Sequence, residues 1–351
     1  MERRLPVVPD GRDEFGHVPE VAFDARRNLE LNVGMACNNA CVFCVSGLPE
    51  GKESRRWLPL EKAVRELDVA FERGCRSVGF LGGEPTIWPE LLPAVRHARA
   101  RGYTRVAVCS NGMRYDDAAF VRALVDAGVT RFAVSVHSHR AEIEHELTKV
   151  PDALERKVAG LRHLLAERAA GRLPDNVSIN PVLNRRTYAE VVEFITFFVA
   201  LGVDDIRFNF IRPEGKAEIE HDIARAIIPT FTQVAPYIRR AVAANERRFK
   251  IHLTFGEMPL CGLPEELLRR PALLRKYVGE FQDLTTDVAL FAAPRREQGQ
   301  DGLDRFNWQD RKRGQLKQPV QACTTCRFGG TCFGVARGYV ALHGEQEFRP
   351  L

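Results

Sequence analysis

Three closely spaced cysteines near the start of the chain could hold a metal centre. They are Cys37, Cys41 and Cys44, with the spacing C-x3-C-x2-C, inside the stretch NVGMACNNACVFCVSG. A cubane iron–sulfur cluster or a tetrahedral metal ion takes four ligands, so three thiolates leave one position for another ligand. The spacing favours an iron–sulfur cluster, and a zinc site or three incidental cysteines are the alternatives.

A second cysteine group lies near the end of the chain. Cys323, Cys326 and Cys332 form the pattern C-x2-C-x5-C, and Cys261 lies upstream of them. Together they supply four thiolates, which is enough to complete a cubane cluster without an outside ligand. A structural zinc site is the alternative for this group.

The amino-acid composition is typical of a globular protein. The 351 residues, 45% of them hydrophobic and 28% charged, suffice for one large α/β domain and a smaller appendage. The net charge of +5 is too small to indicate a nucleic-acid partner. No apolar run of about 18 residues and no signal peptide occurs, so we expect a cytoplasmic protein without a membrane partner. We expect the two remaining cysteines, Cys75 and Cys109, to be packing residues.

Short β-rich runs alternate with amphipathic runs six times along the chain. This rhythm predicts repeated β/α units with a parallel sheet. Strands are predicted at 29–34, 76–82, 105–111, 131–137, 177–183 and 205–211, and helices near 59–73, 88–102, 116–128, 153–170, 187–202 and 218–246. One more strand is predicted in the stretch FKIHLTFGEMPLC that leads to Cys261.

The predicted strands have one apolar face and one small or polar face. In 131–137, for example, Phe132 and Val134 alternate with Ala133 and Ser135. A closed eight-stranded barrel fills its interior with branched apolar side chains, which this pattern does not supply. We therefore predict an α/β fold with a partial (β/α)6 barrel and a polar lumen. The expected divisions are an N-terminal extension (1–27), the barrel (28–246) and a small C-terminal domain (247–351).

A glycine-rich stretch, LGGEP at 81–85, follows the second predicted strand. The first cysteine group follows the first strand, so both motifs belong to the C-terminal edge of the sheet, where parallel α/β folds place their chemistry. Gly82 and Gly83 allow a ligand to approach the backbone closely, and Glu84 adds a carboxylate. A zinc module requires none of these features.

The combination of C-x3-C-x2-C after the first strand and G-G-E-P after the second resembles the radical S-adenosylmethionine (SAM) superfamily, over residues 28–215. The resemblance implies that Cys37, Cys41 and Cys44 hold a 4Fe-4S cluster whose open iron is chelated by SAM. It further implies reductive cleavage of SAM to a 5′-deoxyadenosyl radical that abstracts hydrogen from a substrate. A flavodoxin- or ferredoxin-type protein would supply the electron.

The same resemblance assigns residues to SAM. Gly82, Gly83 and Glu84 match the segment that receives the methionyl ammonium, and Phe43 matches an aromatic residue often found against adenine. The remaining matches are Asn111 and Ser135 at ribose- or carboxylate-binding positions, Asn180 at a ribose position, and Ile211, within FIRPEG, whose backbone would hold adenine.

The C-terminal cysteine group resembles the SPASM or twitch extensions found behind many radical SAM barrels. A full SPASM extension carries seven or more cysteines and two clusters. Here Ala336 stands where a further cysteine would follow Cys332. The resemblance therefore implies one auxiliary 4Fe-4S cluster, held by Cys261, Cys323, Cys326 and Cys332.

The substrate is predicted only by class, as a peptide or a small molecule. His137 and Arg212 end predicted strands at the catalytic edge and are candidates to bind or deprotonate it, with His139 and Arg140 nearby. The first predicted strand begins at residue 29, so we expect no N-terminal leader-binding module of the kind found in peptide maturases. The alternative function is a zinc or iron–sulfur protein that carries electrons or acts as a sensor without SAM chemistry.

Overall fold

A computed structural model describes residues 24–46, 56–216, 221–282, 284–291, 302–330 and 332–351. Within them, one sheet has the strand order β10-β9-β1-β2-β3-β4-β5-β7-β6, with β8 paired to β7. All pairs are parallel except β9 with β10. The strands are β1 (Asp24–Asn32), β2 (Ser77–Leu81), β3 (Arg105–Ser110), β4 (Arg131–Val134), β5 (Val177–Ile179), β6 (Val182–Leu183), β7 (Asp205–Phe210), β8 (His252–Gly256), β9 (Leu284–Phe291) and β10 (Leu303–Asn307).

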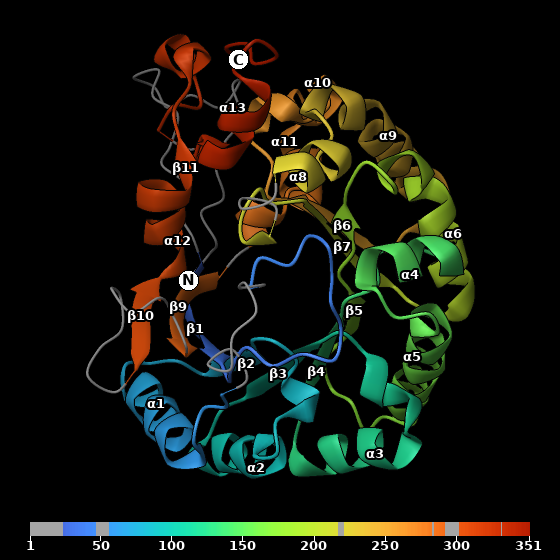
Figure 1. The fold of residues 1–351 in the computed structure, drawn as a ribbon, viewed down its shortest axis with the longest axis vertical. Helices are drawn as coiled ribbons and strands as arrows, with labels where there is room; N and C mark the ends of the chain where they lie inside the picture. Colours follow the sequence, from blue (N-terminus) through green and yellow to red (C-terminus); the bar gives the residue numbers. More distant parts are fainter. Residues whose placement is uncertain (1–23, 47–55, 217–220, 283, 292–301, 331) are drawn as a thin grey trace.

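The sheet curves around a central space, and the helices lie along its outer side (Figure 1). The helices are α1 (Leu60–Glu72), α2 (Leu91–Arg101), α3 (Ala118–Ala127), α4 (Ala141–Thr148), α5 (Ala153–Ala169), α6 (Val191–Leu201), α8 (His221–Ile227), α9 (Phe231–Ala244), α10 (Glu265–Leu268), α11 (Pro271–Tyr277), α12 (Trp308–Arg311) and α13 (Arg337–His343). A two-stranded sheet, β11 (Lys317–Gln318) with β12 (Val335–Ala336), belongs to the C-terminal part. The predicted α/β class with a largely parallel sheet is confirmed.

The two faces of the strands differ as predicted. Val106 and Val108 of β3 are fully buried toward the helices, as are their counterparts on neighbouring strands. Cys75 is also fully buried, which confirms it as a packing residue. The prediction that Cys109 packs in the same way is wrong, because its position on the polar face of β3 leaves it exposed.

The predicted long helix at 218–246 is two helices. α8 ends at Ile227, and α9 begins after Thr230, whose hydroxyl accepts a hydrogen bond from the backbone N–H of Gln233. The Gln233 side chain in turn accepts from the backbone N–H of Thr230, which completes a capping box. Pro229, directly before the cap, lacks the N–H that a continuous helix would need.

The sheet extends past the barrel units on both sides. β8 pairs with β7, while β9 returns to pair with β1, so strands after residue 247 lie on both sides of the six predicted strands. The division of the chain near residue 247 remains a prediction. No helix among the described residues combines the length and apolar character that a membrane crossing requires.

Candidate active site

The cysteine loop and the glycine-rich stretch are bonded to each other directly. The backbone N–H of Gly83 donates to the carbonyl oxygen of Gly34 (N···O 2.6 Å), and the N–H of Glu84 donates to that of Ala36 (2.8 Å). A Cβ atom on Gly83 would collide with the carbonyl of Ala36, so only glycine permits this approach. Two motifs separated in the sequence therefore form one structure that begins immediately before Cys37.

Two further elements support the cysteine loop. The last carbonyls of α4 accept hydrogen bonds from it, Thr148 from the N–H of Ala40 (3.0 Å) and Leu147 from the N–H of Val42 (3.0 Å). Carbonyl groups at a helix C-terminus lack partners within the helix, so α4 has these acceptors available. The segment after β7 also reaches the loop, where the N–H of Lys216 donates to the carbonyl of Cys44 (3.2 Å).

Glu84 is fully buried and connects the ends of β2 and β3. Its carboxylate accepts from the hydroxyl of Ser110 (2.7 Å), the N–H of Asn111 (2.7 Å) and both the N–H and the hydroxyl of Thr86 (2.9 and 2.5 Å). Burial raises the pKa of this carboxyl, and the hydrogen bonds oppose the rise. Glu84 thus positions the edge of the sheet, and its predicted role toward SAM remains a prediction.

A buried ionic network lies behind α4. Lys157 of α5 and Glu144 of α4 are both fully buried, and their Nζ and Oε1 atoms lie 2.5 Å apart. The other carboxylate oxygen of Glu144 accepts from the N–H groups of His137 (2.9 Å) and Ser138 (2.8 Å). Burial would raise the pKa of Glu144, but the charge of Lys157, the charge that His137 carries once protonated in acid, and the hydrogen bonds of the carboxylate hold that pKa below the ordinary value.

The predicted adenosine-binding residues occupy the same edge. Phe43 is buried and packs edge-on against His137, with ring centroids 4.8 Å apart. Asn111 donates through Nδ2 to Oδ1 of Asn38 (2.7 Å) and contacts Sγ of Cys37 (3.7 Å). Oδ1 of Asn180 is buried and finds no hydrogen-bond partner among the described residues. An orphaned acceptor of this kind fits a ligand hydroxyl.

Two further predicted SAM residues are placed by backbone hydrogen bonds between strand ends. The N–H of Ser135 donates to the carbonyl of Ser110 (2.8 Å), which holds Ser135 beside the end of β3. The N–H of Ile211 donates to the carbonyl of Leu183 (3.0 Å), and the Ile211 side chain is 1% exposed. The predicted backbone contact of Ile211 with adenine remains a prediction.

The donor set of the first cysteine group fits an iron–sulfur cluster. Cys37, Cys41 and Cys44 are free thiols that lie within electrostatic range of one another. Burial raises the pKa of Cys41 to about 12, so binding iron requires loss of the thiol proton. No group of three potential ligands within the described chain is arranged to share a single metal ion. A cubane places each of its thiolates on a different iron atom.

The second cysteine group surrounds a cavity. Cys261, Cys323, Cys326 and Cys332 all line a space of about 260 Å³, together with Phe328 and other residues. Burial, followed by the proximity of the other three thiols, raises the pKa of Cys261 to about 12. Cys261 belongs to the short turn η7 (Leu260–Gly262) that follows β8, and the other three come from the segment between β11 and β12. Four thiols from two distant segments therefore line one space.

The candidate substrate residues do not form one group. His137 is buried, and burial lowers its pKa to about 4, so it is neutral near pH 7. Arg140 lies at the surface in ion pairs with Glu142 (2.6 Å) and Glu190 (2.8 Å). Arg212 faces the C-terminal part, with its guanidinium 5.2 Å from the ring centroid of Trp308.

His139 packs against aromatic side chains of α6. Its ring centroid is 6.1 Å from that of Phe197, on α6.

Sequence reasoning did not single out Lys157, Glu144 or Gly215, which support the cysteine loop. Gly215 has a φ of +63°, and a Cβ there would meet the carbonyl oxygens of Cys44 and Val45. The glycine in FIRPEG was a usable signal for this contact, whereas a single lysine inside a helix was not.

Residues 31–198 match the family model described as the radical SAM superfamily. The chain therefore contains a radical SAM domain over these residues. Among curated proteins, a probable GTP 3′,8-cyclase of Saccharolobus islandicus is 33% identical over 219 residues, which is 61% of this chain. One of Sulfurisphaera tokodaii is 30% identical over 204 residues, or 58% of this chain and 59% of that protein. This chain spans 65% of the length of the first of these relatives.

A solved structure shares the fold over nearly the whole chain. SuiB of Streptococcus suis, bound to S-adenosylmethionine, aligns with 95% of this chain and 77% of its own, with a TM-score of 0.62 and 15% identity. SuiB bound to its precursor peptide SuiA gives the same TM-score and covers 76% of that chain. At this identity the likeness concerns the fold. The superfamily implies a 4Fe-4S cluster and SAM.

Proposed function

We propose that this chain binds a 4Fe-4S cluster through Cys37, Cys41 and Cys44, binds SAM beside it, and uses the pair to abstract hydrogen from a peptide or a small molecule. When bound, the cluster and SAM supply a 5′-deoxyadenosyl radical by reductive cleavage. The bonds from Gly83 to Gly34 and from Glu84 to Ala36 carry this proposal, because they hold the three thiols and the glycine-rich stretch at one edge.

The residues of the chain would divide the work of binding SAM. The glycines at 82 and 83 present backbone without side chains, Phe43 offers an aromatic edge, and the unpartnered Oδ1 of Asn180 offers an acceptor. Glu84 is fixed by four hydrogen bonds, so the ends of β2 and β3 are preorganised.

We also propose that Cys261, Cys323, Cys326 and Cys332 hold one auxiliary 4Fe-4S cluster. The shared cavity supports this assignment, because it gives all four thiols access to one space. A fully ligated cluster could take an electron from a substrate radical or serve only to shape the substrate site.

The central test is product detection. Anaerobically reconstituted protein, reduced with dithionite and given SAM, should form 5′-deoxyadenosine in a mass-spectrometric assay. A variant with Cys37, Cys41 and Cys44 changed to Ala should form none. Two cubanes correspond to about eight iron atoms and eight sulfides per chain. About four of each with bound zinc would refute the auxiliary cluster, and lack of 5′-deoxyadenosine from fully loaded protein would refute the SAM reaction.

The alternative function, a carrier or sensor without SAM chemistry, is tested by calorimetry, because such a protein should not bind SAM. For the substrate, the names of the curated relatives make GTP the first small molecule to assay. A peptide remains the second class. We place the protein in the cytoplasm, with a flavodoxin- or ferredoxin-type donor as its reductant.

A further inference from the structure

The positive charge of the chain is concentrated in one segment. Residues 239–276 contain nine Arg or Lys and four Glu, a surplus of five positive charges. The whole chain has a net charge of +5, so the remainder is neutral as a whole. The nine basic residues, all exposed, are Arg239, Arg240, Arg247, Arg248, Lys250, Arg269, Arg270, Arg275 and Lys276.

Most of these charges are not neutralised locally. Three of the nine pair with carboxylates: Arg239 with Glu266 (3.3 Å), Arg269 with Glu265 (2.6 Å) and Lys276 with Glu246 (2.6 Å). The fourth acidic residue of the segment, Glu257, faces Lys317 instead (3.5 Å). The other six cations have no carboxylate partner within the described parts of the chain.

The basic residues belong to elements that touch one another. The pair of Arg239 and Glu266 joins α9 to α10. The pair of Lys276 and Glu246, supported by a hydrogen bond from the Tyr277 hydroxyl to Glu246 (2.6 Å), joins α11 to the π-helical turn η6 (Asn245–Phe249). We call the exposed side of α9, η6, α10 and α11 the α9–α11 surface.

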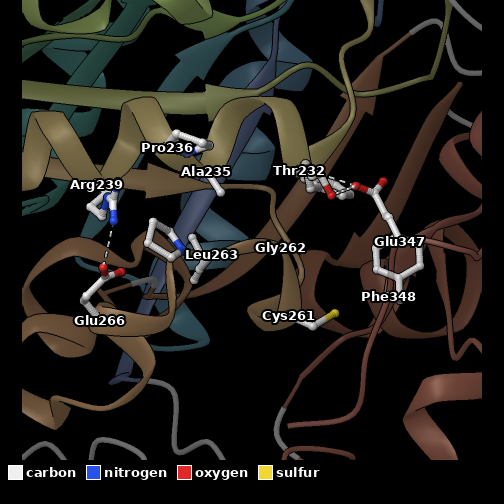
Figure 2. Close-up of a pocket in the computed structure, with 12 residues that line it drawn as sticks. Thr232, Ala235, Pro236, Arg239, Cys261, Gly262, Leu263, Glu266, Glu347 and Phe348 are labelled. Carbon is white, nitrogen blue, oxygen red and sulfur yellow. Dashed lines mark hydrogen bonds and ion pairs between the residues drawn. The ribbon is translucent and has the colours of Figure 1, made fainter.

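An open groove of about 360 Å³ borders this surface and contains an auxiliary cysteine. Figure 2 shows the groove, with Arg239 and Glu266 paired at one end and Cys261 near Phe348 at the other. Cys261 also lines the separate cavity that it shares with the other three auxiliary cysteines. It is therefore the residue that lies between the surface groove and the proposed cluster.

We propose that the α9–α11 surface is the docking site of an acidic one-electron carrier protein, which exchanges electrons with the auxiliary cluster on the Cys261 side. This inference rests on the auxiliary cluster proposed above. A surface of unneutralised cations attracts an acidic partner and orients it during encounter. One electron passes from the reduced carrier to the oxidised cluster, with no bond formed or broken. A nucleic acid is the competing partner, but the groove beside Cys261 gives a redox protein a reason to bind here.

The test measures the dissociation constant of a bacterial flavodoxin for the whole reconstituted chain. The variant Arg239→Glu/Arg270→Glu reverses the charge of Arg239, which lines the groove, and that of Arg270, an exposed cation of the same surface without a carboxylate partner within the described residues. The control variant is Arg96→Glu/Arg162→Glu. It makes the same charge change at two exposed arginines on distant helices, α2 and α5. We expect the first variant to bind about tenfold more weakly and the control to stay within about twofold. Binding by the wild type should weaken as salt rises.

A second readout separates docking from loss of the cluster. Oxidation of reduced flavodoxin by the protein should slow in the first variant, while SAM cleavage driven by dithionite should not change. Iron content is measured on every sample, so a missing auxiliary cluster would refute the proposed function while the dissociation constants still test the surface. Equal affinities in the two variants would overturn the docking site. A transfer RNA that binds more tightly than flavodoxin and is lost in the first variant would also overturn it.

Discussion

Lys157 and Glu144 form a fully buried ion pair, 2.5 Å between Nζ and Oε1, directly behind the loop that carries the first cysteine group. Glu144 belongs to α4, whose last two carbonyls accept hydrogen bonds from that loop. Lys157 belongs to α5, so the pair fixes α4 against α5. The position of the loop therefore depends on a charge that lies outside both sequence motifs.

Replacing Lys157 with Met should be strongly destabilising. The change leaves the carboxylate of Glu144 buried without its counter-charge, which typically costs about 3–5 kcal/mol. Urea unfolding of the cluster-free protein measures the loss, and iron content after reconstitution measures the effect on the loop. The double variant Lys157→Met/Glu144→Gln removes both charges and should recover part of the stability. A double variant no more stable than the single one would show that packing, rather than charge, is what the pair supplies.

Gly83→Ala should separate the two motifs of the site. The new Cβ would collide with the carbonyl of Ala36, so we expect the affinity for SAM to fall about tenfold or more, equivalent to at least about 1.4 kcal/mol, with less iron retained. Gly79→Ala, in the middle of β2, is the matched control because a Cβ there meets nothing within 4 Å. Calorimetric titration with SAM gives the comparison. Similar losses of SAM affinity in both variants would contradict the proposed role of the contact between Gly83 and Ala36.

The barrel strands were predictable because their pattern is local. β3 (Arg105–Ser110) and β7 (Asp205–Phe210) lie within one residue of the predicted ranges 105–111 and 205–211. Alternation between an apolar and a polar face identified them, and burial on one side produces that alternation. The split at Pro229 was also visible in the sequence, since a proline followed by T-x-x-Q predicts a new helix start.

β9 was not predictable in the same way. Its sequence, LTTDVALF, does not alternate cleanly, and its pairing with β1 joins residues at opposite ends of the chain. Such a non-local contact leaves no periodic signal in either partner. The site shows the same limit. Cysteine spacing identified the thiols, but Lys157 is one of many lysines until the fold buries it against Glu144.

Asn180→Ala should weaken SAM binding without destabilising the protein. Oδ1 of Asn180 has no hydrogen-bond partner within the described residues, so its removal breaks none there. Asn184 provides the opposite case. It is fully buried, accepts from the N–H of Arg186 (2.9 Å) and donates to the carbonyl of Val182 (2.9 Å).

We therefore expect Asn184→Ala to lower the free energy of unfolding by about 1–3 kcal/mol with little change in SAM affinity. Asn180→Ala should weaken SAM binding with little change in the free energy of unfolding. Denaturant unfolding and SAM titration on both variants give a crossed comparison. Unchanged SAM affinity in Asn180→Ala would remove this residue from the proposed site.

The free energy of unfolding should fall in acid, because protonation of Asp205 removes part of the stabilisation. Its carboxylate is fully buried and contacts Arg207 (2.8 Å), Arg131 (3.4 Å) and His252 (3.9 Å). Burial alone would raise its pKa, but the hydrogen bonds and charge of Arg207, with the charges of Arg131 and His252, hold the pKa below its ordinary value. Because the folded state favours the ionised form, the stabilisation is complete above the ordinary pKa of about 3.9 and is lost as the pH falls toward the folded value.

Asp205→Asn should therefore cost about 3 kcal/mol or more at pH 7, because Arg131 and Arg207 would lose their buried counter-charge. The difference in unfolding free energy between wild type and Asp205→Asn should be constant between about pH 8 and 5 and should shrink below about pH 4. Asp204→Asn is the control, since Asp204 is half-exposed in its pair with Arg168 and should cost under about 1 kcal/mol. Unfolding free energies of both variants and wild type, measured across this pH range, test whether the difference shrinks toward acid. A difference that grew toward acid would mean that Asp205 is protonated in the folded protein.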